Sequence, residues 1–339
     1  MDHPDYDVAV IGAGGAGMSA ALTAASDGAR VVLVEAGDQV GGSTVLSGGV
    51  FYAAGTHIQR QMGFTDSAEA MYRYYMAVNR HDVVPDLVRK LCEESADTLN
   101  WLIALGVDYR PEGLYYSGAE EIPRGHKPVG LGASIVAALD AALGKHPVDV
   151  ALRTRVTALI TDSSGQVCGF RSGSETISAG AVVLTTGGFG SNPEKLQRYF
   201  PDAASAGDWT WYIGSKGSQG EGLDLGQSVG ADIVGFNRGL VLLTDNFAHD
   251  VQAQLPAWLL FATQGGHRFV NESTNMAIVV EMVLGMPGRQ CFGIFDEDSR
   301  LACHYATERN PSYQCELLAS LADSGKLIRE VAQQNKTNL

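Results

Sequence analysis

A glycine-rich turn near the N-terminus constrains the fold of this chain more than any other feature. A short apolar segment, residues 7–11, leads into Gly-Ala-Gly-Gly-Ala-Gly at positions 12–17, and an alanine-rich segment, residues 18–25, follows. A second apolar segment, residues 30–34, then ends on Glu35. Short β-branched runs are typical of buried parallel strands, and the segment between them is typical of a helix. This order predicts the strand–turn–helix–strand unit that binds dinucleotides.

Each glycine of the turn has a physical role in such a unit. Gly12 makes the tight turn, Gly14 lets the backbone come close to a pyrophosphate, and Gly17 lets the helix pack on the strand. The helix N-terminus offers N–H groups and a positive dipole end to the phosphates. Glu35, at the tip of the second strand, is placed to hold ribose hydroxyls. The predicted contact residues are Gly12, Ala13, Gly14, Gly15, Ala16, Gly17, Glu35 and Ala36.

A second run of small and hydroxyl residues follows the predicted ribose-binding strand. Residues 41–49 read Gly-Gly-Ser-Thr-Val-Leu-Ser-Gly-Gly. Backbone and hydroxyl groups in such a run can lie against a long flat ligand that continues from the pyrophosphate; the alternative is an ordinary flexible loop. The glycine turn alone does not distinguish FAD from NAD. The predicted contacts in this run are Gly42, Ser43, Thr44, Ser47, Gly48 and Gly49.

Composition limits the class of protein and its partners. The chain has 339 residues, 45% of them hydrophobic, which is enough for a large core and about two domains. With 24 Lys+Arg against 38 Asp+Glu, the formal net charge of −14 argues against a nucleic-acid or anionic-membrane partner. Five cysteines without a CxxC pair favour neither disulfides nor a metal site. No signal peptide or membrane span is expected, so a cytoplasmic location is predicted.

Periodicity indicates the organisation of the middle of the chain. Residues 63–105 have apolar side chains at helical spacing, and Thr65, Asp66 or Ser67 can cap the first of these helices. Residues 148–186 alternate β-rich runs with polar hairpin loops.

Several blocks of sequence occur in one order along nearly the whole chain. They are residues 12–17, 41–49, 124–128 (Arg-x-His-x-Pro), 155–160, 181–189, 220–222 and 266–272, which contains Arg-Phe-x-Asn-Glu. In these blocks the chain resembles the FAD-binding fumarate reductase and succinate dehydrogenase flavoprotein superfamily, which also holds flavocytochrome c reductases and 3-ketosteroid dehydrogenases. The resemblance implies FAD rather than NAD, and a strand over 155–160. It adds cofactor contacts at Val156, Thr186, Gly187, Gly188 and Glu221.

The resemblance also implies the architecture. We expect an α/β fold with a Rossmann-like FAD-binding domain over residues 1–232, a helical insertion over about 63–122, and an α+β cap (substrate) domain over residues 233–339. In the family the chain then returns to the FAD domain and covers the flavin. No counterpart of that returning segment follows Arg300, so the chain is expected to be shortened relative to the family, with a polar helix near its end.

The family transfers a hydride between flavin N5 and a carbon next to a polarised C–C bond. Its proton carrier is arginine in fumarate reductases and tyrosine in ketosteroid dehydrogenases, and that position here is Met276, which cannot carry a proton. The family's upstream relay residues align with Gln252 and Leu255, and residues 255–261 form a strongly apolar stretch. Because buried carboxylates need cations and donors, these departures argue against a dicarboxylate substrate.

We therefore predict an FAD-dependent dehydrogenase or reductase acting on a C–C bond next to a carbonyl. The favoured substrate is an apolar small molecule such as a steroid ketone, with a separate electron donor or acceptor. Candidate catalytic residues are Tyr52, Tyr116 and Arg300. The alternatives are a fumarate-reductase-like reductase of small unsaturated acids and a catalytically impaired flavin-binding protein.

Overall fold

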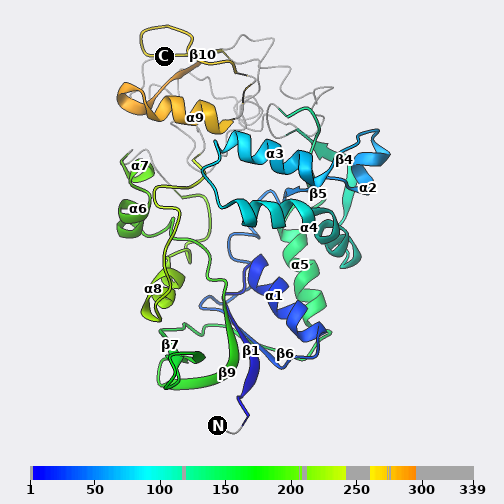
Figure 1. Cartoon of the computed structure of the whole chain (residues 1–339), viewed down its shortest axis with the longest axis vertical. Coiled ribbons are helices and arrows are strands. Elements are labelled where there is room, and N and C mark those ends of the chain that lie inside the picture. Colours follow the sequence, from blue (N-terminus) through cyan, green and yellow to red (C-terminus); the bar gives the residue numbers. More distant parts are fainter. Residues whose placement is uncertain are drawn as a thin grey trace, which may run out of the picture.

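A six-stranded sheet forms the base of the chain in the computed structural model (Figure 1). The residues that the structure describes are 3–116, 120–205, 207, 212–241, 260–272, 274 and 276–294. The strand order is β6-β2-β1-β9-β8-β7. The bounds are β1 Tyr6–Ile11, β2 Val31–Val34, β6 Val148–Ala151, β7 Ala158–Thr161, β8 Val167–Ser172 and β9 Glu175–Leu184.

The first four strands of that order are parallel, and the last two form an antiparallel extension. Register pairs include Val10 with Leu33 in β2 and with Val183 in β9. The strands β7, β8 and β9 pair antiparallel, which confirms the alternation of strands and hairpin loops predicted for residues 148–186. The strand expected over residues 155–160 was misplaced, because β7 begins only at Ala158.

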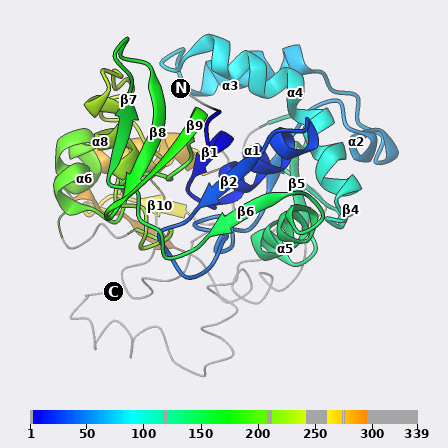
Figure 2. The ribbon, with the colours of Figure 1, turned by 90° about the horizontal axis from the view of Figure 1, so that it is seen from below.

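Helices on one face of the sheet enclose the larger core. α1 (Gly15–Ser26) and α5 (Leu131–Leu143) share a buried cluster that includes Met18, Leu22 and Leu139. A second cluster on the other face joins Ile11 and Val34 to Leu225 of α8 (Glu221–Ser228). In Figure 2 the sheet runs from β7 at one edge to β6 at the other, with α5 near the β6 edge. The predicted α/β fold is confirmed.

The predicted helical segment is also present. It contains α3 (Ala68–Val78) and α4 (Pro85–Ala104), and a further short helix, α2 (His57–Gln61), precedes it. Of the three candidate caps, Ser67 begins α3, where its side chain accepts a hydrogen bond from the backbone N–H of Ala70. Beside these helices lies a small antiparallel sheet of order β3-β5-β4, with β3 Phe51–Tyr52, β4 Tyr109–Tyr115 and β5 Gly125–Pro128.

Shorter elements make up the remaining described residues. They are α6 (Pro193–Tyr199), α7 (Pro201–Ala204), α9 (Met276–Leu284), a 3-10 turn (Pro287–Arg289), and the antiparallel pair β10 (Leu260–Ala262) and β11 (Phe292–Ile294). Figure 1 shows α9 at the end of the molecule opposite the N-terminus. The domain division at residue 232 and the limits of the helical insertion stay predictions, and the expected terminal helix lies outside the described residues. Within those residues, no helix combines the length and apolarity needed to cross a lipid bilayer.

Candidate functional site

The glycine turn has the geometry that the sequence predicts for it. Gly12 has φ +103°, and a Cβ there would lie 2.5 Å from the Thr185 carbonyl oxygen. A Cβ on Gly17 would lie 1.8 Å from the Gly12 carbonyl oxygen, so α1 packs on the turn at a distance that only glycine allows. By contrast, a Cβ on Gly14 would meet no atom within 4 Å. The backbone at Gly14, next to the N-terminus of α1, is therefore open to a phosphate group.

Glu35 is held at the tip of β2 by backbone donors. Its Oε2 accepts a hydrogen bond of 2.8 Å from the Ala13 N–H, and its Oε1 accepts one of 2.7 Å from the Gly37 N–H. These bonds fix the carboxylate beside the glycine turn and leave it further acceptor sites, since each carboxylate oxygen has two lone pairs. The position fits the predicted role of holding ribose hydroxyls.

The run over residues 41–49 lies directly against this turn. The Gly41 N–H donates to the Ala13 carbonyl at 2.8 Å, and the Gly15 N–H donates to Thr44 Oγ1 at 3.1 Å. A Cβ on Gly42 would lie 3.4 Å from Gly14 Cα. Since the two glycine runs are this close, one ligand can contact both.

The far end of the same run meets the start of α5. The Gly132 N–H donates to the Ser47 carbonyl at 3.0 Å, and a Cβ on Gly132 would lie 1.9 Å from the Thr44 carbonyl oxygen. Gly49 has φ +67°, and a Cβ there would lie 2.6 Å from the backbone nitrogen of Gly132. Ser47, Gly48 and Gly49 are therefore held against the start of α5 by backbone contacts.

The end of β9 completes the arrangement. Thr185 Oγ1 donates to the carbonyls of Ile11 and Gly12 at 2.9 and 2.8 Å, which ties β9 to the glycine turn. Thr186, Gly187 and Gly188 follow directly, with φ +74° at Gly187. The carboxyl ends of β1, β2 and β9 thus converge where ligands bind in open α/β sheets. The residues present fit FAD, and the glycine turn and Glu35 would hold its ADP half.

Two of the cofactor residues implied by resemblance have other partners in the structure. Val156 precedes β7 and is buried in the apolar cluster with Leu225. Glu221, in the first turn of α8, forms an ion pair with Arg155. Cofactor contacts from these two residues stay predictions.

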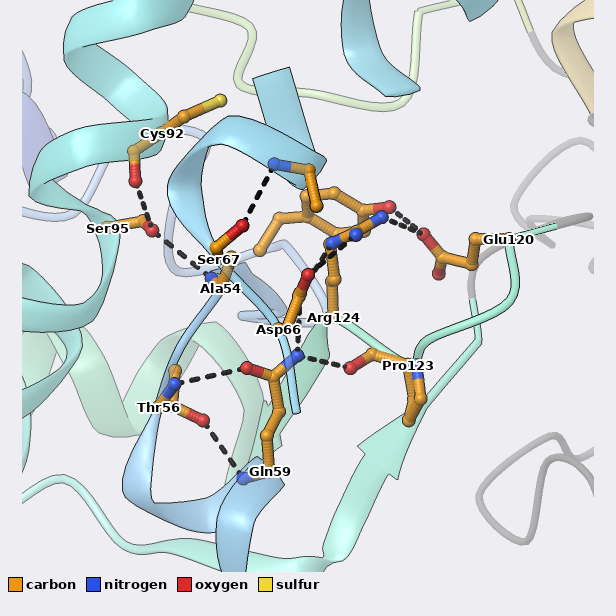
Figure 3. A network of polar contacts seen from close by, with 12 residues as sticks. Ala54, Thr56, Gln59, Asp66, Ser67, Cys92, Ser95, Glu120, Pro123 and Arg124 are labelled. Carbon is orange, nitrogen blue, oxygen red and sulfur yellow. Dashed lines mark hydrogen bonds and ion pairs between the residues drawn. The ribbon is translucent and has the colours of Figure 1, made fainter. Parts of the chain in front are cut away.

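A buried polar network lies beside the small sheet (Figure 3). Arg124 donates to both carboxylate oxygens of Asp66, at 2.7 and 2.8 Å, and its Nη1 lies 3.8 Å from Glu120 Oε2. The side chains of Asp66 and Glu120 are 0% exposed and that of Arg124 is 5% exposed. Tyr52, the first catalytic candidate, donates its phenolic hydrogen to Glu120 Oε2. The network therefore places two carboxylates around one guanidinium and connects them to a phenol.

Further hydrogen bonds hold this network in place. Gln59 Nε2 donates to Asp66 and to the Pro123 carbonyl, at 3.1 and 2.8 Å. Thr56 caps α2 through the Gln59 N–H, and its hydroxyl contacts His126 Nε2 at 2.9 Å. Burial lowers the pKa of His126, so the neutral imidazole is favoured. His126, the histidine of the Arg-x-His-x-Pro block, is therefore a buried residue that is hydrogen-bonded within the protein.

The other catalytic candidates lie elsewhere or outside the described residues. Tyr116 is half-buried one residue after β4, and its ring meets Phe64 edge to face at 6.3 Å between centroids. Arg300, Gln252 and Leu255 lie outside the described residues. Tyr52 is connected, through Glu120, to the buried ion pair of Arg124.

The Arg-Phe-x-Asn-Glu block forms a local ion pair. Arg268 Nη2 lies 2.6 Å from Glu272 Oε2, and Glu272 Oε1 also accepts from the Phe261 N–H at 3.0 Å. The hydrogen bond from Arg268 lowers the pKa of Glu272 to about 2. Arg268 thus stabilises the segment around β10 through its ion pair with Glu272.

Comparisons with known proteins agree with this site. The sequence profile of a family described as FAD binding domain matches residues 7–305. A fumarate reductase (cytochrome) of Shewanella frigidimarina is 30% identical over 311 residues, which cover 88% of this chain and 53% of that protein. The chain thus spans about half the length of that curated relative.

Two solved structures are similar over nearly the whole chain. A flavocytochrome c3 fumarate reductase in an open conformation has a TM-score of 0.77 at 26% identity, covering 99% of this chain and 59% of the other. A 3-ketosteroid-Δ4-(5α)-dehydrogenase from Rhodococcus jostii RHA1, in complex with 4-androstene-3,17-dione, has a TM-score of 0.72 at 27% identity, covering 93% and 71%.

The fold and the site define a flavoprotein with a dinucleotide-binding sheet. The chain belongs to the FAD-binding flavoprotein family that contains fumarate reductases and 3-ketosteroid dehydrogenases, and FAD is the cofactor that the family indicates.

Sequence reasoning did not find the partners in the buried network. Asp66 was a candidate helix cap, but it pairs with Arg124, 58 residues away. Glu120 carried no signal in the sequence, since it lies 68 residues from Tyr52. A signal for Arg124 was present in the Arg-x-His-x-Pro block, although that block did not reveal its partner.

Proposed function

We propose that this protein is an FAD-dependent oxidoreductase that transfers a hydride between flavin and a C–C bond next to a carbonyl, on an apolar ketone such as a steroid. The observation that carries the choice of substrate is that three arginines of the blocks shared with the family, all among the residues that the structure describes, are already paired. Arg124 pairs with Asp66, Arg155 with Glu221, and Arg268 with Glu272. A dicarboxylate needs unpaired cations, because burying its charges without them costs several kcal/mol.

Exposed apolar side chains beside the cofactor run support the same choice. Val45 is 39%, Leu46 61% and Val50 39% exposed, and Leu131, at the start of α5, is 45% exposed. The hydrogen bond between Gly132 and Ser47 brings these two segments together. This apolar surface suits a flat hydrocarbon skeleton better than a small charged acid. The similarity to a ketosteroid dehydrogenase solved with a bound steroid is consistent with this substrate class.

Tyr52 is our candidate for moving the proton that accompanies the hydride. Bound flavin supplies the hydride chemistry. In the dehydrogenation direction, the Tyr52 phenolic oxygen takes a proton from the substrate carbon next to the carbonyl, and the proton already on that oxygen passes to Glu120 Oε2. Arg124 stabilises both carboxylates and orients Glu120. β3 continues from the cofactor run, so Tyr52 lies three residues after Gly49.

The second candidate function is reduction of small unsaturated acids. It is favoured by the fumarate reductase relative and by the similar flavocytochrome structure. The paired cations described above are the reason to rank it second. Either reaction also requires a separate electron donor or acceptor for the flavin.

An anaerobic reaction of the FAD-loaded protein with candidate substrates tests the proposal. We expect saturated 3-ketosteroids to bleach the oxidised-flavin absorption and succinate to leave it unchanged. Tyr52→Phe should slow the bleaching by about 100-fold, since general acid–base catalysis contributes on that scale. Tyr116→Phe keeps the ring contact with Phe64 and separates the two tyrosine candidates. If succinate bleaches the flavin and the ketosteroids do not, the second function is favoured.

A further inference from the structure

A tyrosine outside the predicted cofactor motifs connects two parts of the cofactor site. The Tyr212 hydroxyl donates to Ser218 Oγ at 3.1 Å and lies 3.4 Å from Ser43 Oγ. Ser43 belongs to the 41–49 run. Ser218 lies beside the turn after β9, where a Cβ on Gly187 would be 3.6 Å from its hydroxyl oxygen. The phenol therefore joins the run beside the glycine turn to the turn at the end of β9.

Two glycines make room for the ring of Tyr212. A Cβ on Gly190 would lie 2.2 Å from Tyr212 Cδ2, and one on Gly214 would lie 2.4 Å from Tyr212 Cζ. Neither glycine has a positive φ, so the backbone conformation does not demand glycine at either position. The absence of a side chain is instead what lets the ring lie against both segments.

The hydroxyl groups around Tyr212 form a small ordered cluster. Ser43 Oγ accepts from the Ser215 N–H at 2.9 Å, and Ser218 is buried, at 4% exposure. A serine hydroxyl has one hydrogen to donate and two lone pairs, so Ser43 keeps capacity for a ligand. Tyr212 itself is 42% exposed, which leaves part of its ring available for contact.

We infer that Tyr212 is an additional flavin-contacting residue. Its ring forms a wall of the cofactor site between the 41–49 run and the turn at 186–188, and its hydroxyl orients Ser43. A phenol suits this position because it combines a flat apolar face with a polar tip, as a flavin and its polar chain require. The inference rests on the FAD site alone and is independent of the proposed ketone substrate.

The test is a titration of purified protein with FAD, followed by flavin fluorescence, with visible circular dichroism of the bound flavin. Tyr212→Phe removes the hydrogen bonds and keeps the ring, so the Kd should rise about fivefold. Tyr212→Ala also removes the ring, so the Kd should rise at least about tenfold and the dichroism of the bound flavin should change. A role in folding alone would leave that spectrum unchanged in folded protein.

Tyr6→Phe is the matched control. The Tyr6 phenol donates to Asp149 at 2.8 Å, at the opposite end of β1 from the glycine turn, so its loss should leave FAD affinity and the spectrum unchanged. Thermal unfolding checks that each variant is folded. The deciding variant is Tyr212→Ala or, if that variant does not fold, Tyr212→Phe. A Kd within about twofold of wild type in the deciding variant, or tighter binding, overturns the inference.

Discussion

The glycine turn and the buried charged network hold polar groups in place by different means. At residues 12–17 the backbone supplies the donors, and the absence of side chains at Gly12 and Gly17 sets the spacing. Around Arg124 the groups are side chains from distant segments, and ion pairing sets the spacing. The turn is consequently sensitive to added atoms, whereas the network is sensitive to lost charge. The turn thus offers backbone groups to a ligand, whereas in the network protein side chains pair with one another.

The largest effect is expected from removing one partner of the buried ion pair. Asp66→Ala leaves the Arg124 guanidinium without its bidentate partner in a site that is 5% exposed, so unfolding free energy should fall by about 3–5 kcal/mol. Chemical denaturation measures the loss. Asp7→Ala is the control, because its pair with Arg30 is about half exposed, so its loss should lower the unfolding free energy several times less. Equal losses in the two variants would contradict the role given to burial.

A pair of glycine substitutions tests whether the turn is sensitive to added atoms. Gly17→Ala places a methyl group against the Gly12 carbonyl and should destabilise the protein by about 3 kcal/mol. Gly14→Ala meets no protein atom and should change stability by less than about 0.5 kcal/mol. The same Gly14→Ala variant should weaken FAD binding about tenfold or more. If Gly14→Ala binds FAD like wild type, the phosphates do not approach the backbone there.

The smallest effect is expected at a charged pair that is only partly buried. Arg268 is 57% exposed while Glu272 is 6% exposed, so Glu272→Gln should cost on the order of 1 kcal/mol at neutral pH. Because Arg268 depresses the pKa of Glu272 to about 2, this stabilisation is complete above the ordinary pKa of 4.5. It is lost as the pH falls through 2. Hydrogen exchange at the Phe261 amide, which donates to Glu272, measures this local stabilisation. Equal exchange in wild type and variant at neutral pH would contradict the assignment.

The two regions also differ in how far they can be predicted from sequence. The turn, the first helix and Glu35 depend on residues near one another in the chain, so local spacing predicts them correctly. The network depends on pairs separated by 58 and 68 residues, which no local pattern reports. Asp66 illustrates the limit, because an aspartate before a helix predicts a cap equally well. Ser67 takes that role and leaves Asp66 for Arg124.

The start of the strand expected over residues 155–160 was misplaced for a related reason. This block resembles a strand of the family, and β-branched residues favour strands. In the structure Val156 instead packs into the cluster between the sheet and α8, just before β7 begins. Tertiary packing thus overrides local propensity at that point.

The central claim is that the glycine turn and Glu35 hold the ADP half of FAD. A calorimetric titration of the protein with FAD and, separately, with FMN tests it most directly, because FMN carries the same flavin but lacks the AMP part of that half. We expect one FAD per chain and FMN binding at least about 100-fold weaker, since it forfeits hydrogen bonds to charged groups worth about 1.5–3 kcal/mol each. FMN binding as tight as FAD binding, or no binding of either, would contradict the claim.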